Sequence, residues 1–180
     1  MAKKPAGRKA PAKKAAAKKA APKKKVPFIP AGYHSVTPYL ACREAGRAIE
    51  FYQQAFGAKE LLRIPAPGGK IGHAEIRIGD SRVMLTDEYP EMDFLSPQTR
   101  GGTTVHLHVY LKDVDAAVAR AVAAGARLTR EVQDQFYGDR TGTLQDPFGH
   151  VWHLATHKED LSKAEMRKRA EKAMKEMGGG

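Results

Sequence analysis

The chain has 180 residues, of which 42% are hydrophobic, enough for one domain or for two small halves that share a core. Its charge is distributed unevenly, because residues 1–25 carry ten lysines, one arginine and no acidic residue. The rest of the chain holds 20 basic and 20 acidic residues, so the net charge of +11 belongs to the first 25 residues. The single cysteine, Cys42, excludes a disulfide within the chain and fits a reducing compartment.

Residues 1–32 are predicted to form a disordered tail, because their alanine, lysine and proline repeats offer few large apolar side chains to bury. The tail lacks the apolar run of a secretory signal, and no stretch of the chain approaches membrane-spanning length, so we expect a cytoplasmic protein that does not enter a membrane. Lysines of this kind bind nucleic acid through its phosphates without reading bases, and the alternative is a tail that only improves solubility. The candidate contacts are Lys13, Lys14, Lys18, Lys19, Lys23, Lys24 and Lys25.

Apolar periodicity predicts the elements of the first half in chain order. An extended run over residues 33–40 precedes a helix over residues 43–56, which ends at Gly57. Strands are then expected over residues 59–64, 71–78 and 82–87, with a turn between the last two. The order of elements in this half is therefore βαβββ.

The second half repeats that order, with a strand over residues 104–111, a helix over residues 114–124, a strand over residues 127–131 and a closing hairpin. This repeat predicts an α+β domain over residues 33–160, built from two βαβββ modules, 33–88 and 103–157. Each module has a helix for only one face of its sheet, so we expect the modules to form a shared curved sheet around one cavity. Ser162 and Glu165 form a capping box for a C-terminal helix over residues 161–177.

The closing hairpin carries the most informative motif. The turn Asp146-Pro147-Phe148-Gly149 has proline in the second position and glycine in the fourth, which suits a type I turn. The preceding Gly138-Asp139-Arg140 and the following run from His150 to His157 complete the pattern. This pattern resembles the vicinal oxygen chelate superfamily, which contains glyoxalases, bleomycin-resistance proteins and dioxygenases, and within it the PhnB-like, demethylubiquinone methyltransferase-like branch.

The resemblance implies positions for metal ligands, which in metal-dependent members lie on the first and last strand of each module. In the second module these positions fall on His106 and His153, whose imidazoles suit Zn, Ni or Fe. In the first module they fall on Val36 or Thr37 and on Met84, none of which is a usual ligand for these ions. The alternative is that the two imidazoles hydrogen-bond a ligand or each other.

Strand alternation places further candidates beside these histidines. His108 and Tyr110 share a face with His106, opposite the apolar face of the same strand, and Met84, Tyr137 and Arg140 are the remaining candidate ligand contacts. Asp139 and Arg140 most simply form a local ion pair that fixes the hairpin, and the alternative is that Arg140 binds an anionic ligand through two hydrogen bonds. Glu75 is the candidate general base if burial raises its pKa, with a cross-strand charge beside Arg77 as the alternative. Trp152 and Cys42 are expected to be packed, and His150, just beyond the turn, to be a capping or solvent-exposed residue and not a catalytic one.

The resemblance therefore implies a protein that binds a small molecule, with a metal-dependent lyase or dioxygenase reaction as the enzymatic version. One alternative is non-catalytic binding of a drug or metabolite, and another is a nucleic-acid-associated protein tethered through its tail. A homodimer is expected from the same resemblance.

Overall fold

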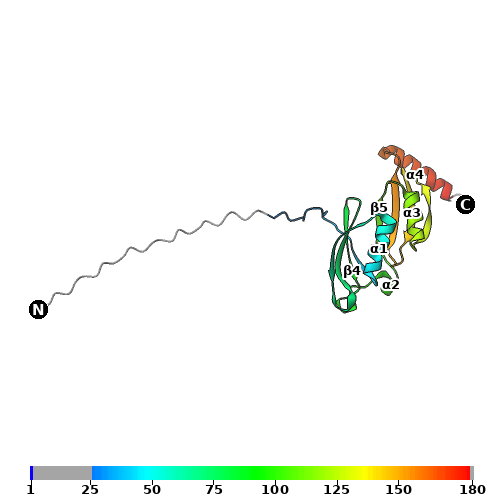
Figure 1. Cartoon of the computed structure of the whole chain (residues 1–180). Coiled ribbons are helices and arrows are strands. Elements are labelled where there is room, and N and C mark those ends of the chain that lie inside the picture. The colour runs from blue at the N-terminus through cyan, green and yellow to red at the C-terminus, as the bar shows by residue number, and fades with distance from the viewer. Residues whose placement is uncertain (2–25, 179–180) are drawn as a thin grey trace.

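The computed structural model describes Met1 and residues 26–178, which contain two modules of the same element order followed by a helix (Figure 1). The first module comprises β1 (Tyr39–Cys42), α1 (Ala45–Phe56), β2 (Lys59–Pro65), η1 (Pro67–Gly69), β3 (Ile71–Ile78) and β4 (Ser81–Asp87). The connector holds η2 (Pro90–Met92) and α2 (Pro97–Arg100). The second module comprises β5 (His106–Tyr110), α3 (Val114–Ala123), β6 (Arg127–Asp134), β7 (Asp139–Gln145) and β8 (Val151–His157), and α4 (Lys163–Gly178) follows it. The α+β class and the repeated βαβββ order are confirmed.

The strands form two four-stranded sheets, with the orders β1-β4-β3-β2 and β5-β8-β7-β6. In each sheet the first strand runs parallel to the last strand of its module, and the other pairs are antiparallel. This arrangement differs from the single shared sheet that the repeat predicts. β1 and β5 are both edge strands, and the helices α1 and α3 pack against each other, so the modules meet through side chains instead of a strand ladder.

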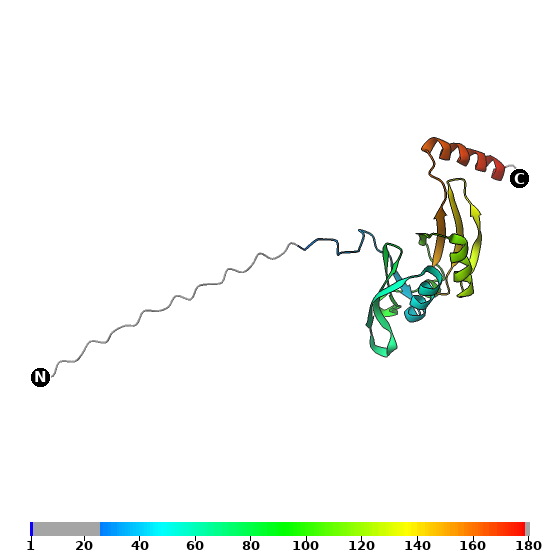
Figure 2. The same cartoon turned by 45° about the horizontal axis from the view of Figure 1, so that its top comes forward.

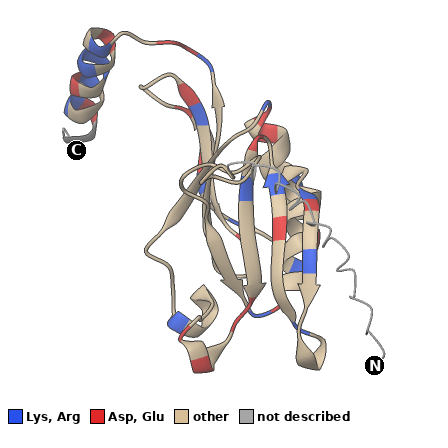
Figure 3. Cartoon of the chain, turned by 90° about the vertical axis from the view of Figure 1, so that its left-hand side faces the viewer, with Lys and Arg blue, Asp and Glu red and all other residues tan. Residues whose placement is uncertain are grey.

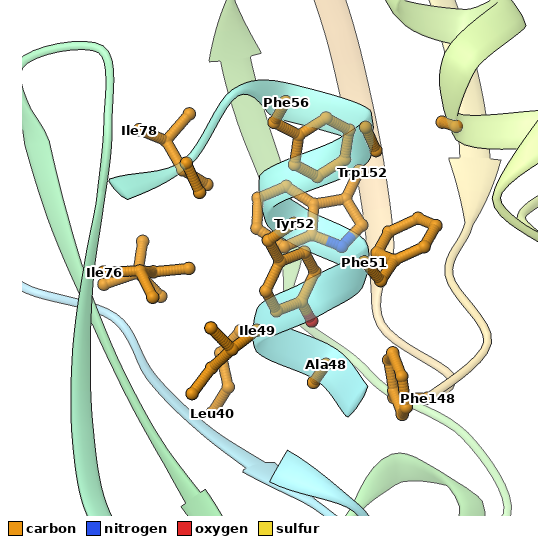
Figure 4. Packing of buried hydrophobic residues seen from close by; sticks show 14 of the residues in the cluster. Leu40, Ala48, Ile49, Phe51, Tyr52, Phe56, Ile76, Ile78, Phe148 and Trp152 are labelled. Atoms are coloured by element: carbon orange, nitrogen blue, oxygen red, sulfur yellow. The ribbon is translucent and has the colours of Figure 1, made fainter. Parts of the chain in front are cut away.

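Helix α1 joins the two modules into one hydrophobic core. Its C-terminal Gly57 adopts the left-handed conformation, at φ 67°, that ends many helices. Ile76 and Ile78 approach the helix from the first sheet, whereas Trp152 and Phe148 approach it from the second module (Figure 4). Trp152 is 1% exposed, which confirms that it belongs to the core.

Two departures from the predicted elements follow from contacts distant in sequence. The first strand begins at Tyr39 and not at Tyr33, directly after Pro38. Solvent exposure of His150 is wrong: the residue is buried, and its Nε2 lies 3.2 Å from the carbonyl oxygen of Ala41 on β1. Burial lowers the pKa of His150 and raises that of the neighbouring Cys42 thiol, which is packed as expected.

Helix α4 extends away from the sheets (Figure 2). The hydroxyl of Ser162 accepts a hydrogen bond from the backbone N–H of Glu165, as a capping residue does, and Arg169 pairs with Glu159 and Glu165. Basic and acidic residues follow one another along this helix (Figure 3). Among the described helices, none combines the length and the apolar character needed to cross a bilayer.

Gly138, in the turn between β6 and β7, is expected to tolerate no side chain. Its φ is +93°, and a Cβ atom there would lie 2.5 Å from the carbonyl oxygen of Glu159. We expect Gly138→Ala to lower the free energy of unfolding by about 3 kcal/mol, since backbone strain and a clash with a fixed carbonyl add. Gly79→Ala is the matched control, because Gly79 also has a positive φ but nothing lies near its Cβ position. It should cost only about 1 kcal/mol, and equal losses in urea unfolding would contradict the role of the Glu159 contact.

Candidate functional site

Three histidines gather on one face of the second sheet. The parallel register of β5 and β8 places His108 opposite His153, and His106 lies one step along the same face. His106 Nδ1 is 3.0 Å from His153 Nε2, and His153 Nδ1 is 2.9 Å from the hydroxyl oxygen of Thr143 on β7. The rings of His108 and His153 are stacked, at 25° and 6.2 Å between centroids. The structure thus brings the two candidate metal ligands into direct contact.

The protonation of this cluster is limited by its own charges. Burial lowers the pKa of His153, and positive charge on His106, His108 and Arg130 lowers it further. One of the two facing nitrogens carries a proton in their hydrogen bond. The lowered pKa keeps the imidazole of His153 neutral at neutral pH.

The residues that the structure describes do not complete a metal site. His106 and His153 offer two imidazole nitrogens, and Thr143 adds only a hydroxyl that is already bonded to His153. In residues 26–178 there is no group of three or more His, Cys, Asp or Glu side chains placed to hold an ion. Of the first-module positions, Val36 is exposed and Met84 lies in the other sheet. A Zn, Ni or Fe ion would thus need further ligands from elsewhere.

A second polar chain lies further along the same face. The hydroxyl of Tyr110 donates to Asp139 Oδ2 at 2.9 Å, and His157 Nδ1 lies 2.7 Å from Asp139 Oδ1. This hydrogen bond to Asp139 raises the pKa of Tyr110, so the phenol keeps its proton at neutral pH. Asp139 is 5% exposed, and both of its carboxylate oxygens are occupied.

His157 is expected to make stability depend on pH. The hydrogen bond to Asp139, and after it the one to Asp160, raises the pKa of His157 above that of an unfolded histidine, which is about 6.5. Its contribution is therefore fully present below that pH and is lost as pH rises through the higher pKa of the folded state. Thermal melts of the wild type and His157→Gln from acidic to alkaline pH should converge as pH rises. Asp160→Asn should give a smaller change of the same sign, and a gap that widens with pH would contradict this assignment.

Arg140 forms its ion pairs with Asp115 and Asp134, not with Asp139. It binds Asp115 of α3 through two hydrogen bonds of 2.7 and 2.8 Å, and it also reaches Asp134 at 3.3 Å. The local ion pair with Asp139 that sequence proximity suggests is therefore wrong, because side chains at adjacent strand positions point to opposite faces. The guanidinium of Arg140 is already engaged by two carboxylates.

Glu75 lies on β3 in the first sheet, opposite Met84. Its carboxylate forms an ion pair with Arg82 of β4. Arg82 Nη1 is 2.6 Å from Glu75 Oε2, and Arg82 itself lies under the ring of Tyr33. The hydrogen bond from Tyr33, followed by those from Arg82 and His73, outweighs burial and lowers the pKa of Glu75. The raised pKa that a general base at Glu75 would need is thus absent, and Glu75 forms the alternative cross-strand ion pair, with Arg82 instead of Arg77.

A cavity of about 370 Å³ lies between the modules. Residues 34–38 and the turn between β3 and β4 form one wall, and β5 forms the other, with Trp152 behind it. His108 and Tyr110 line this cavity together with Arg82 and Ser81, whereas Met84 and Tyr137 lie outside its lining. Its volume falls within the usual range for small-molecule sites, about 300–1,000 Å³. A second and more open hollow, of about 720 Å³, lies between β1, the connector and the start of β5.

Sequence reasoning missed Thr143, Arg82 and Trp152 as residues of the site. Thr143 pairs directly with His153 across β7 and β8, so the strand register alone would find it. Arg82 and Trp152 reach the cavity only because the modules pack together, which no local pattern shows. The seven candidate lysines from Lys13 to Lys25 lie outside the described residues.

Comparison with known proteins agrees with this fold. The family model described as "Glyoxalase/Bleomycin resistance protein/Dioxygenase superfamily" matches residues 32–154. The protein Rv0887c of Mycobacterium tuberculosis is 45% identical over 123 residues, which are 67% of this chain and 72% of that protein.

Two solved structures share the fold. TioX from Micromonospora sp. ML1 aligns over 72% of this chain and all of its own length, at 29% identity and a TM-score of 0.54. The PhnB protein from Bacillus cereus aligns over 68% of this chain and 99% of its own length, at 18% identity and a TM-score of 0.54. The resemblance carried by the closing hairpin is thus confirmed: the chain belongs to the glyoxalase/bleomycin resistance protein/dioxygenase superfamily, with a PhnB protein among its structural neighbours.

Proposed function

We propose that this protein binds a small organic molecule in the cavity between its two modules. The observation that carries the proposal is the lining of that cavity, which combines His108, Tyr110 and Trp152 of the second module with Arg82 of the first. Polar groups that orient a ligand, set among apolar side chains such as Ile78, Val83 and Leu107, are typical of small-molecule sites. The neighbouring His106, His153 and Thr143 supply further hydrogen-bonding groups on the same sheet.

The side chains of the site favour binding of the small molecule without a metal ion. His106 and His153 are hydrogen-bonded to each other, and Glu75, the candidate base, is paired with Arg82. A metal-dependent lyase or dioxygenase would use His106 and His153 as two ligands and would need the others from a substrate or a second subunit. We therefore place non-catalytic binding of a metabolite or drug first.

The single tryptophan provides the test, because Trp152 lines the cavity. Small molecules that enter the cavity should change its fluorescence with a saturable dependence on concentration. Ser81→Phe places a large side chain at an exposed position of the lining and should weaken such binding at least tenfold. Lys59→Phe, exposed on β2 and outside the lining, is the matched control. Equal affinities for the wild type and Ser81→Phe would contradict this location.

The homodimer expected from the family is part of the proposal. Edge strand β2 exposes Leu61, Leu62 and Ile64, each at least 40% accessible, and a second subunit would cover these side chains. We expect light scattering to give twice the chain mass and Ile64→Glu to shift it toward the monomer. A monomer at every protein concentration would contradict this part of the proposal.

A chain with a single, buried cysteine fits the reducing cytoplasm, where we expect it to act.

A second candidate function is attachment to nucleic acid through the tail. The charge distribution of the sequence favours it, since the whole net charge of +11 lies in residues 1–25. A phosphate-binding tail would hold the small-molecule-binding domain near a polyanion without affecting the cavity.

A further inference from the structure

The side chain of Tyr110 is held by a chain of three hydrogen bonds. Its hydroxyl donates to Asp139 Oδ2, and Asp139 Oδ1 lies 2.7 Å from His157 Nδ1. His157 Nε2 lies in turn 3.1 Å from Asp160 Oδ1. Asp139 is nearly buried and bonded at both oxygens, so its carboxylate has one orientation, and that orientation fixes the hydroxyl of Tyr110. The ring of Tyr110, which is 60% exposed, is thereby held at the cavity wall.

The hydroxyl of Tyr110 is therefore already used, and what the residue offers to a ligand is its ring. That ring meets the imidazole of His108 at 4.8 Å between centroids and 56° between planes. The ring of His108 is also stacked with that of His153. A planar aromatic ligand that stacks on the ring of Tyr110 or of His108 presents its edge to the other of these two rings. Stacked and edge-to-face arrangements are both favourable between aromatic groups. An aliphatic ligand of equal size gains only the burial of its surface.

The charges around the cavity do not call for a charged ligand. Arg82, the basic residue of the lining, is paired with Glu75 at 2.6 Å. Asp80, the acidic residue of the lining, is exposed to solvent and accepts a hydrogen bond from the hydroxyl of Ser81. Asp139, behind the wall, is satisfied by Tyr110 and His157. A neutral aromatic probe is therefore sufficient to test the wall.

We propose that Asp139 is a positioning residue that holds Tyr110 in place, so that Tyr110 and His108 form an aromatic wall, and that the ligand of this cavity carries a planar aromatic ring. This inference rests on the proposed function, because it names the class of ligand for the same cavity.

The ligand class is tested with 2-naphthol and its saturated analogue decahydro-2-naphthol, titrated calorimetrically into the full-length protein. The wild type should bind 2-naphthol about fivefold more tightly than the saturated analogue, given the strength of aromatic pairs. Tyr110→Leu should bring the ratio of the two affinities close to one. Equal binding of both probes, or no binding of 2-naphthol, would overturn the aromatic ligand. If aliphatic molecules still change the fluorescence of Trp152, small-molecule binding in the cavity remains supported. If no molecule changes it, the proposed function is contradicted as well.

The positioning role of Asp139 is tested by the ratio of the affinities for 2-naphthol and its saturated analogue, measured in variants that lack the hydrogen bond between Tyr110 and Asp139. Tyr110→Phe and Asp139→Ala remove that bond from opposite ends, so each should lower the ratio by the same factor, and the double variant should lower it no further. Asp139→Asn keeps an acceptor oxygen and should restore the ratio. Asp115→Ala, which breaks the ion pair of the adjacent Arg140, is the control and should leave the ratio unchanged. Should Asp139→Ala fail to fold, Tyr110→Phe decides alone: a wild-type ratio there would overturn the role of Asp139.

Discussion

Replacing Asp146 by alanine is expected to lower the free energy of unfolding by about 4 kcal/mol, the largest loss that we expect from a single exchange in this chain. The carboxylate of Asp146 is 4% exposed and accepts four hydrogen bonds. Two come from the backbone N–H groups of Phe148 and His150 within the turn, at 2.9 Å each. The other two come from the hydroxyl of Tyr52 on α1, at 2.8 Å, and from the indole N–H of Trp152, at 2.9 Å. Alanine would leave these four donors without their acceptor in the centre of the core.

The loss should therefore affect both modules together, because Tyr52 belongs to the first and Trp152 to the second. Buried donors that lose their acceptor cost about 1–3 kcal/mol each, and relaxation or water entry recovers part of that sum. Asp146→Asn retains one acceptor oxygen and should lose about half as much. Asp80→Ala, at an exposed turn, is the control and should stay within about 0.5 kcal/mol of the wild type. Urea unfolding followed through the fluorescence of Trp152 measures all three variants. A loss in the free energy of unfolding below about 1 kcal/mol for Asp146→Ala would contradict the proposed role of Asp146 in joining the two modules.

The second large effect is expected for binding to DNA, whose affinity should depend steeply on salt if the tail binds phosphates. Six lysine–phosphate contacts predict a slope of about −5 for the logarithm of affinity against the logarithm of salt concentration. Between about 50 and 200 mM salt the affinity should therefore fall about a thousandfold. Scrambling the DNA sequence should leave the affinity unchanged, since phosphate contacts carry no base information.

Removal of residues 1–25 should abolish this binding and leave the melting temperature almost unchanged. A full-length variant with glutamine at the ten lysines of that segment is the matched control, because it keeps the length of the tail and loses the charge. It should behave like the deletion. Unchanged affinity for DNA in either variant would exclude the tail as the contact.

The parts of the structure that follow from local rules could be predicted from the sequence. Period-two alternation placed His106, His108 and Tyr110 on one face of β5, and the glycine after α1 marked the end of that helix. The repeated order of helices and strands gave the two modules, since each element is recognisable from its own residues.

The remaining features depend on packing between elements that are distant in sequence. Arg140 lies next to Asp139 in the chain but binds Asp115, which required the position of α3 over the second sheet. Tyr52 and Phe56 of α1 pack against Trp152 of β8, and this contact joins the two modules. His150 is buried because β1 offers it the carbonyl of Ala41, more than a hundred residues earlier in the chain. Alternation and capping rules contain no information about such contacts.

The claim that small molecules bind between the modules is tested most directly by fluorine NMR of the protein labelled with 5-fluorotryptophan. Trp152 is the only tryptophan, so one resonance reports on the wall of the cavity. Titration with 2-naphthol and with a panel of aliphatic alcohols should shift this resonance saturably in the wild type and in Lys59→Phe, and far less in Ser81→Phe. A resonance that stays in place with every molecule, or that shifts equally in Ser81→Phe, would contradict binding at this cavity.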